Sequence, residues 1–143
     1  MQRILTDGMD LQPVLLKGGV LRVDFGAEWP EVLIRLEGTD VGGDEHRTVV
    51  ETGALILREV EPTPEMFEWV ATEGGEYLIG HVRVIVGDNP GDKALLVYES
   101  RILGDFLDEE ELEISLHTTR FLASELGETL QARFGGKRWN EES

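Results

Sequence analysis

The chain has 143 residues, with 29 acidic and 13 basic side chains, a formal net charge of −16 and no cysteine. This length is typical of one domain with one hydrophobic core, so we expect a single domain over residues 1–143. The charge repels phosphate backbones and anionic lipid, which disfavours nucleic acid and membranes as partners. The lack of cysteine excludes disulfides and thiolate metal sites and favours a cytoplasmic location. The N-terminal residues resemble no signal peptide, and no apolar run is long enough to span a membrane.

The first sixty residues carry the signals of β-strands. VLLKGGVLRVDF has apolar runs on both sides of residues 17–19, which predicts a glycine-turn hairpin within an extension over residues 1–25. EVLIRLE, residues 31–37, alternates apolar and polar positions in the period of a half-buried strand. RTVVETGALILREV, residues 47–60, predicts a further strand, with a break or bulge near Gly53.

A helical pattern follows in EPTPEMFEWVATEGGEY. Thr63 is a plausible N-cap, Pro64 suits the first helical position, and the glycines at 74–75 predict an end near residue 73. At about 100° per residue, one face of this helix carries Met66, Phe67, Val70 and Ala71. Trp69 falls outside that face, so we expect its indole at an edge or exposed to solvent.

Residues 77–103 predict two strands joined by the turn 87–92. One side of the first strand carries Leu78, Val82, Val84 and Val86, and the other carries His81, Arg83 and Ile85. With Arg101 and Tyr98 from the second strand, His81 and Arg83 predict a polar and aromatic patch. The alternative is ordinary solvated strand positions that pair with Glu99 or Glu76.

Five acids lie within the six positions 108–113, and their carboxylate oxygens could in principle bind calcium or magnesium. Asp108 and Glu111 instead have the spacing of an N-cap and capping box, and carboxylates are favoured at a helix N-terminus. An apolar stripe at spacings of three and four then predicts one long helix: Leu112, Leu116, Thr119, Ala123, Leu126, Leu130 and Phe134. The glycines at 135–136 predict its end.

The long helix carries a second apolar feature. Ile114 and Phe121 project nearly opposite the stripe that contains Leu112 and Leu116. Either another part of the same chain covers them, such as the N-terminal segment or Trp139, or they belong to a dimer interface or a client groove.

No pattern in the chain predicts catalysis. The acidic run lacks EF-hand spacing, and Glu113 with His117 lacks the second histidine of a zinc-protease helix. The serines lie outside any nucleophile motif, and the paired glycines lack the Gly-Lys-Ser/Thr ending of a phosphate loop. We therefore expect no enzyme activity, no cofactor and no metal.

Taken in order, the elements and several segments resemble the YbjN family and its actinobacterial relatives, which are grouped with type III secretion chaperones. The segments are EPTPEMFEWV, GHVRVIVGD, ALLVYESRILGDFLDEEELEISL and LGETLQARFGGKRW, within residues 50–139. The most specific part is the C-terminal pattern of Arg101, Leu103, Gly104, residues 108–112 and residues 134–136. The resemblance implies a twisted antiparallel sheet covered by helices, usually in a homodimer, that holds an extended segment of another protein. Secretion chaperones begin with a helix, whereas residues 1–25 here have a strand pattern.

We therefore expect an α+β domain with a twisted antiparallel sheet of about five or six strands, a short helix, a long C-terminal helix and a flexible tail over residues 137–143. Its expected function is to bind a protein or peptide client without catalysis, and the net charge favours a basic client. The expected partner or dimer surface contains Trp69, Ile114, Phe121, Tyr98, Arg83 and Arg101. The alternative is a self-contained dimeric module without a client groove. Acidic mimicry of nucleic acid is less favoured, because the acids are spread along the chain.

Overall fold

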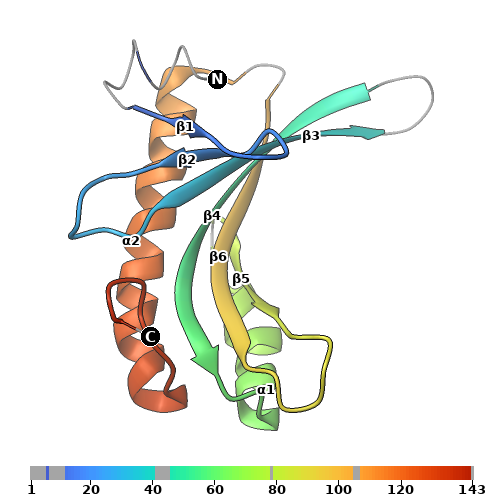
Figure 1. Cartoon of the computed structure of the whole chain (residues 1–143). Helices are drawn as coiled ribbons and strands as arrows, with labels where there is room; N and C mark the ends of the chain where they lie inside the picture. Colours follow the sequence, from blue (N-terminus) through green and yellow to red (C-terminus); the bar gives the residue numbers. More distant parts are fainter. Residues whose placement is uncertain (1–5, 7–11, 41–45, 78, 105–106, 143) are drawn as a thin grey trace.

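The computed structural model describes residues 6, 12–40, 46–77, 79–104 and 107–142. The elements in chain order are β1 (Val14–Leu15), β2 (Leu21–Val23), β3 (Val32–Asp40), β4 (His46–Val60), α1 (Pro64–Thr72), the 3₁₀ turn η2 (Glu73–Gly75), β5 (His81–Ile85), β6 (Ala94–Leu103) and α2 (Glu109–Phe134) (Figure 1). The strands form one six-stranded sheet in the order β1-β2-β3-β4-β6-β5, and every neighbouring pair is antiparallel. The predicted α+β fold class is confirmed.

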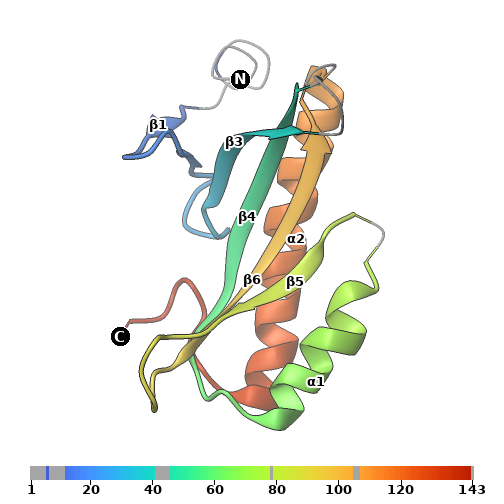
Figure 2. The same ribbon diagram turned by 90° about the vertical axis from the view of Figure 1, so that its right-hand side faces the viewer.

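Both helices lie on the same side of the sheet (Figure 2). The long helix α2 runs along β4 and β6, and α1 packs beside the edge strand β5. An edge-to-face contact between Trp69 and Phe134, with ring centres 6.5 Å apart, joins α1 to the end of α2. The other side of the sheet carries no helix in the described part of the chain, and we call it the open face.

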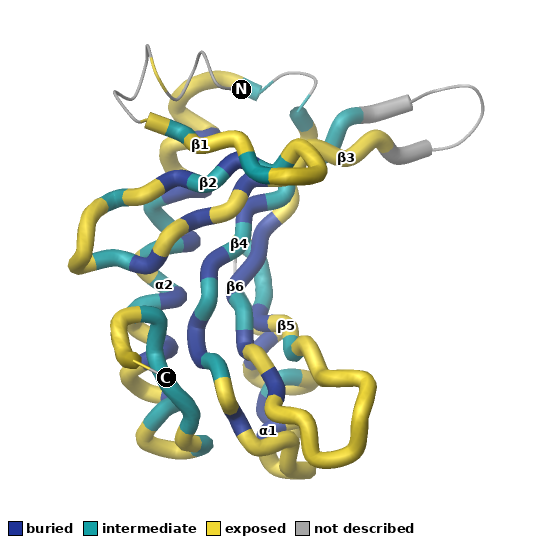
Figure 3. Tube along the Cα trace, viewed as in Figure 1, coloured by how far each residue is buried: buried dark blue, intermediate teal, exposed yellow. Residues whose placement is uncertain are grey.

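The hydrophobic core lies between the sheet and the two helices (Figure 3). Even-numbered positions of the central strands point into it and are buried, among them Val50, Thr52, Ala54 and Ile56 of β4 and Ala94, Leu96 and Tyr98 of β6. The predicted stripe of α2 is confirmed, because its members from Leu112 to Leu130 are all buried and Phe134 is half-buried. Odd-numbered positions of β6, and of β4 as far as Leu55, point to the open face, whereas Leu57 lies beyond a register shift and is buried in the core. Strand alternation thus divides the sheet into a covered side and a free side.

Local capping explains where both helices begin. The Thr63 hydroxyl accepts a hydrogen bond from the Met66 backbone N–H at 3.3 Å, and the Asp108 carboxylate accepts one from the Glu111 N–H at 2.8 Å. Both bonds satisfy N–H groups that have no partner inside the helix. Gly135 follows α2 with a φ of 73°, a conformation that favours glycine. The acidic run is therefore the start of a helix, as predicted.

The irregular part of β4 lies elsewhere than predicted. Pairing continues without interruption through Gly53, and the register shifts fall between Leu55 and Leu57 and between Leu57 and Val60. The pairing of β3 with β4 ends at Ala54. Beyond that residue, β6 is the one strand that pairs with β4 in the described part of the sheet. The strand is free to bend there, and the expectation of a break near Gly53 was wrong.

The C-terminal tail takes the place that β3 leaves empty. Arg58 and Lys137 exchange two backbone hydrogen bonds of 2.8 Å. The Arg138 guanidinium also donates to the backbone oxygen of Ser124 in α2. Lys137, Arg138 and Trp139 are consequently half-buried, whereas the sequence predicted a flexible tail. None of the described helices is long and apolar enough to cross a membrane.

Candidate binding surface on the open sheet face

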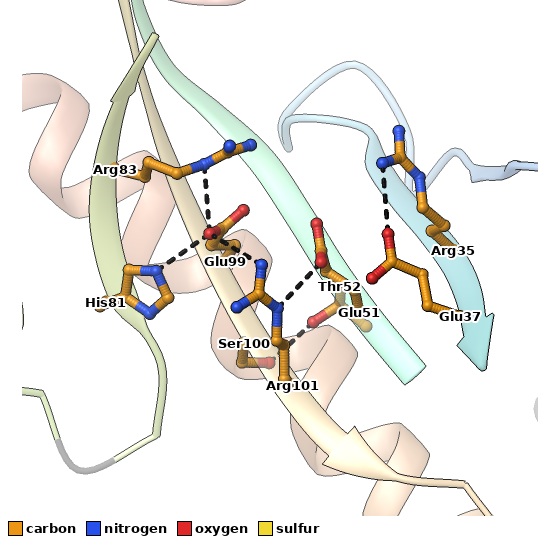
Figure 4. A network of polar contacts seen from close by, with 9 residues as sticks. All are labelled: Arg35, Glu37, Glu51, Thr52, His81, Arg83, Glu99, Ser100 and Arg101. Atoms are coloured by element: carbon orange, nitrogen blue, oxygen red, sulfur yellow. Dashed lines mark hydrogen bonds and ion pairs between the residues drawn. The ribbon is translucent and has the colours of Figure 1, made fainter. Parts of the chain in front are cut away.

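The open face presents rows of side chains that the strand register aligns. Arg35, Glu51 and Arg101 lie side by side across β3, β4 and β6, because Arg35 pairs with Glu51 and Glu51 pairs with Arg101. In the next row Gly53 faces Glu99, which in turn faces His81 of β5. Residues opposite each other on one face interact directly. The register thus brings acidic and basic side chains together in the middle of the open face (Figure 4).

Glu99 is the one charged residue that is buried in the described part of the chain, with 2% of its surface exposed. His81 Nε2 lies 2.9 Å from its Oε1, Arg83 Nε lies 3.2 Å away and an Arg101 terminal nitrogen lies 3.9 Å away. The three side chains point toward the carboxylate from β5 and β6 and cover it (Figure 4). A buried carboxylate requires such donors, because its hydration is lost. We call these four residues the Glu99 cluster.

Arg101 links the Glu99 cluster to β4. Its Nε donates to Glu51 at 3.0 Å, and this hydrogen bond, together with the Glu51 charge, raises the pKa of Arg101 above the usual arginine value. A separate ion pair of 3.5 Å joins Arg35 to Glu37 along β3. The network therefore holds its arginines in fixed positions while leaving their outer edges in solvent.

A hollow of about 920 Å³ on the open face is lined in part by this network, through Arg35, Glu51, Arg83 and Glu99. Its aliphatic lining includes Leu33, Leu55, Ile85, Leu95 and Val97, and Trp29 and Trp139 also border it. Leu33 is 45% exposed and Leu95 is 37% exposed, although both belong to strands. The acidic residues Asp24 and Glu31 also line the hollow. The hollow combines apolar surface with fixed charges, as binding sites commonly do.

Directly beneath the open face, four hydroxyl groups meet between the sheet and α2. Thr52 Oγ1 lies 2.8 Å from Ser100, 3.1 Å from Ser115 and 3.0 Å from Thr119, and the two serines are 3.0 Å apart. All four residues are buried. Among the described residues, the side-chain partners of these hydroxyls are one another. We call these residues the hydroxyl cluster.

The six residues predicted as one partner surface separate into three places. Arg83 and Arg101 converge on Glu99, which is the pairing that the alternative interpretation named. Ile114 and Phe121 are 48% and 50% exposed on α2, away from the open face. No described part of the chain buries them.

Two of the six predictions were wrong because the side chains are core. Trp69 is 8% exposed and contacts Phe134, since the end of α2 covers the side of α1 that helical projection left free. Tyr98 is fully buried on the inward side of β6, and burial raises the pKa of its hydroxyl to about 12. That hydroxyl has no hydrogen-bond partner in the described structure.

From the sequence, Glu99 was expected only as a pairing partner, and its central place in the network was not predicted. A partial signal was present, because His81 and Arg83 alternate along one predicted strand and Glu99 and Arg101 along the next, and the pairing of His81 with Glu99 then places all four on one face. The hydroxyl cluster had a weaker signal, namely small polar residues at inward positions of apolar strands and of the α2 stripe. Within the described residues, no group of three histidine or acidic side chains could hold a metal ion.

A scan against models of known protein families finds none that matches this chain, and a search of curated proteins finds no match either. The resemblance to the YbjN family therefore rests on the sequence segments and the order of the elements.

Proposed function

We propose that this protein is a cytoplasmic, non-catalytic module of the YbjN type that binds a protein or peptide segment on its open face. The observation that carries the proposal is the hollow of about 920 Å³, lined by half-exposed aliphatic side chains on a sheet face that no described helix covers. The resemblance to chaperone-like proteins supports the same class of function.

The chemistry of the hollow favours a segment with both apolar and basic residues. Covering exposed aliphatic surface contributes about 25 cal/mol per Å², so Leu33 and Leu95 would anchor apolar side chains of the client. Of Asp24 and Glu31 on the lining, Glu31 already lies 3.9 Å from Arg22, whereas Asp24 accepts a hydrogen bond from the Gly26 backbone N–H, so Asp24 is the better partner for a lysine or arginine of the client. The net charge of −16 would also speed the encounter with a basic client.

A phage-displayed random peptide library tests the proposal, because it samples many segment chemistries at once. Immobilised wild-type protein should enrich peptides that combine apolar residues with lysine or arginine. The Leu33→Asp/Leu95→Asp double variant should lose these peptides, because two carboxylates would replace the apolar anchors. Phe121→Asp is the matched control on α2 and should retain them. Failure of the wild type to enrich any peptide, or loss only in Phe121→Asp, would contradict binding on the open face.

The second candidate is a self-contained dimeric module, and the exposure of Ile114 and Phe121 is the observation that favours it. Two large apolar side chains on the outer side of one helix are a typical dimer contact. Sedimentation equilibrium at several concentrations would then show a dimer for the wild type and a monomer for Phe121→Asp. A wild-type monomer at every concentration would exclude this candidate.

A further inference from the structure

Arg120 of α2 stands apart from the other arginines on the described surface. Most of these pair with carboxylates: Arg22 with Glu31, Arg35 with Glu37, Arg58 with Glu59, Arg83 with Glu99, Arg101 with Glu51 and Arg133 with Glu73. The Arg120 guanidinium has neither an ion-pair partner nor a hydrogen-bond acceptor among the described residues. In a chain with 29 acids, such a cation is unusual.

Two aromatic rings hold the guanidinium instead. The Arg120 Cζ lies 4.5 Å from the ring centre of Phe25 and 4.6 Å from that of Trp29, both in the connection between β2 and β3. Cation–π attraction of this kind holds a guanidinium against the face of an aromatic ring. Arg120 is half-buried, and the loss of water around it lowers the pKa of its guanidinium. The contacts fix the side chain, but they use none of its N–H donors.

The unused N–H groups of Arg120 determine which chemical groups this side chain can bind. Rings stacked on a guanidinium leave its edge available, and an edge presents parallel N–H groups that match the two oxygens of a carboxylate or phosphate. Because Phe25 and Trp29 already hold the side chain, binding would require little further ordering of Arg120. We call Arg120 with its two rings, Phe25 and Trp29, the guanidinium fork.

A second hollow, of about 450 Å³, adjoins this fork. It is lined by Trp29, His117, Thr118, Arg120, Phe121 and Leu122. Thr118 contributes a hydroxyl that can donate to an oxyanion, and Phe121 is half-exposed on the same lining. The hollow thus combines a charged end with an aromatic surface suited to an apolar group.

We propose that Arg120 binds the carboxylate or phosphate group of a small ligand whose apolar part lies against Phe121. This site is formed by α2 and the connection between β2 and β3, and it does not depend on client binding on the open face. The overall charge of −16 opposes the approach of anions, so binding here would come from local contacts with Arg120.

Titration monitored by NMR of the arginine Nε–Hε signals tests the proposal on the full chain. The probes are phenyl phosphate, phenylacetate, inorganic phosphate and the neutral phenylacetamide, at constant ionic strength. Phenyl phosphate or phenylacetate should shift the Arg120 signal with saturation, and the tighter of the two identifies the preferred oxyanion. Phenylacetamide should leave the signal unchanged.

Three variants separate the parts of the site. Arg120→Lys should weaken binding of the preferred probe at least tenfold, because an ammonium cannot form the parallel pair of donors. Arg133→Lys is the matched control, since Arg133 also lies over an aromatic ring but pairs with Glu73, and it should bind as the wild type does. Phe121→Ser should weaken phenyl phosphate binding and leave inorganic phosphate binding unchanged.

Two results would overturn the inference. One is an Arg120 signal that no anionic probe shifts. The other is equal affinity of wild type and Arg120→Lys for the preferred probe, with chemical shifts that show both proteins to be folded. Neither result bears on peptide capture by the open face, so this proposal and the proposed function fail separately.

Discussion

Thr52→Val tests the hydroxyl cluster under the open face. The substitution keeps the branched shape of the side chain and removes the hydroxyl that contacts Ser100, Ser115 and Thr119. Four protons serve four contacts in the intact cluster if Thr119 donates to Thr52, Thr52 to Ser100, Ser100 to Ser115 and Ser115 to Thr52. The hydroxyls then satisfy one another without water.

The expected loss of stability follows from these contacts. Thr52→Val removes three of them and leaves only the bond between Ser100 and Ser115. Each net hydrogen bond contributes about 1 kcal/mol, and a buried hydroxyl left without a partner costs about 1–3 kcal/mol. We expect the free energy of unfolding to fall by about 2–3 kcal/mol. Thr119→Val removes a single contact, and Thr52 keeps its other two, so the expected fall is about 1 kcal/mol or less.

Equilibrium unfolding in urea, followed by tryptophan fluorescence, measures both changes. Thr129→Val is the matched control in α2, because its hydroxyl is exposed and donates only to the Glu125 backbone oxygen. Its effect should stay within about 0.5 kcal/mol of the wild type. A Thr52→Val protein as stable as the wild type, or less affected than Thr119→Val, would refute the hub role of Thr52.

Tyr98→Phe should change stability by less than about 1 kcal/mol at pH 7, since the hydroxyl lacks a described partner. Burial raises the pKa of Tyr98 from 10.0 to about 12. The stability that depends on the neutral Tyr98 hydroxyl is therefore fully present below pH 10 and is lost as the pH rises through 12. Urea unfolding between pH 10 and 12 should show that the free energy of unfolding falls less steeply with pH in Tyr98→Phe than in the wild type. An equally steep fall in both proteins would contradict the raised pKa of Tyr98. Trp69→Ala should lower the free energy of unfolding by about 3–5 kcal/mol, because Trp69 is buried, and Phe121→Ser should lower it by less than about 1 kcal/mol, because Phe121 is half-exposed. Losses of similar size in urea unfolding would mean that both side chains belong to the core. Glu99→Gln should lower the free energy of unfolding by about 1.5–3 kcal/mol at low salt, because the contacts with Arg83 and His81 lose the negative charge of the carboxylate. An unchanged free energy of unfolding in urea would show that solvent screens these ion pairs.

Local signals in the sequence predicted most of the elements. Thr63 and Asp108 marked where the helices begin, glycines marked where they end, and alternation identified the strands, because these features depend on neighbours a few residues apart. The sequence also grouped His81, Arg83 and Arg101 in one patch, but it added Tyr98, which is buried on the opposite side of β6. The sequence was weaker for the candidate site, since Glu99 takes its place through the register between β5 and β6.

The sequence by itself determined the fold class, the helix boundaries, the direction in which Ile114 and Phe121 project from their helix and the absence of thiol chemistry. Only the tertiary structure decided that Trp69 is core, because its burial depends on where the distant end of α2 packs. The same holds for Arg120, whose stacking rings come from the N-terminal part of the chain. Residues far apart in sequence meet through strand order and helix packing, which side-chain periodicity within one segment does not encode.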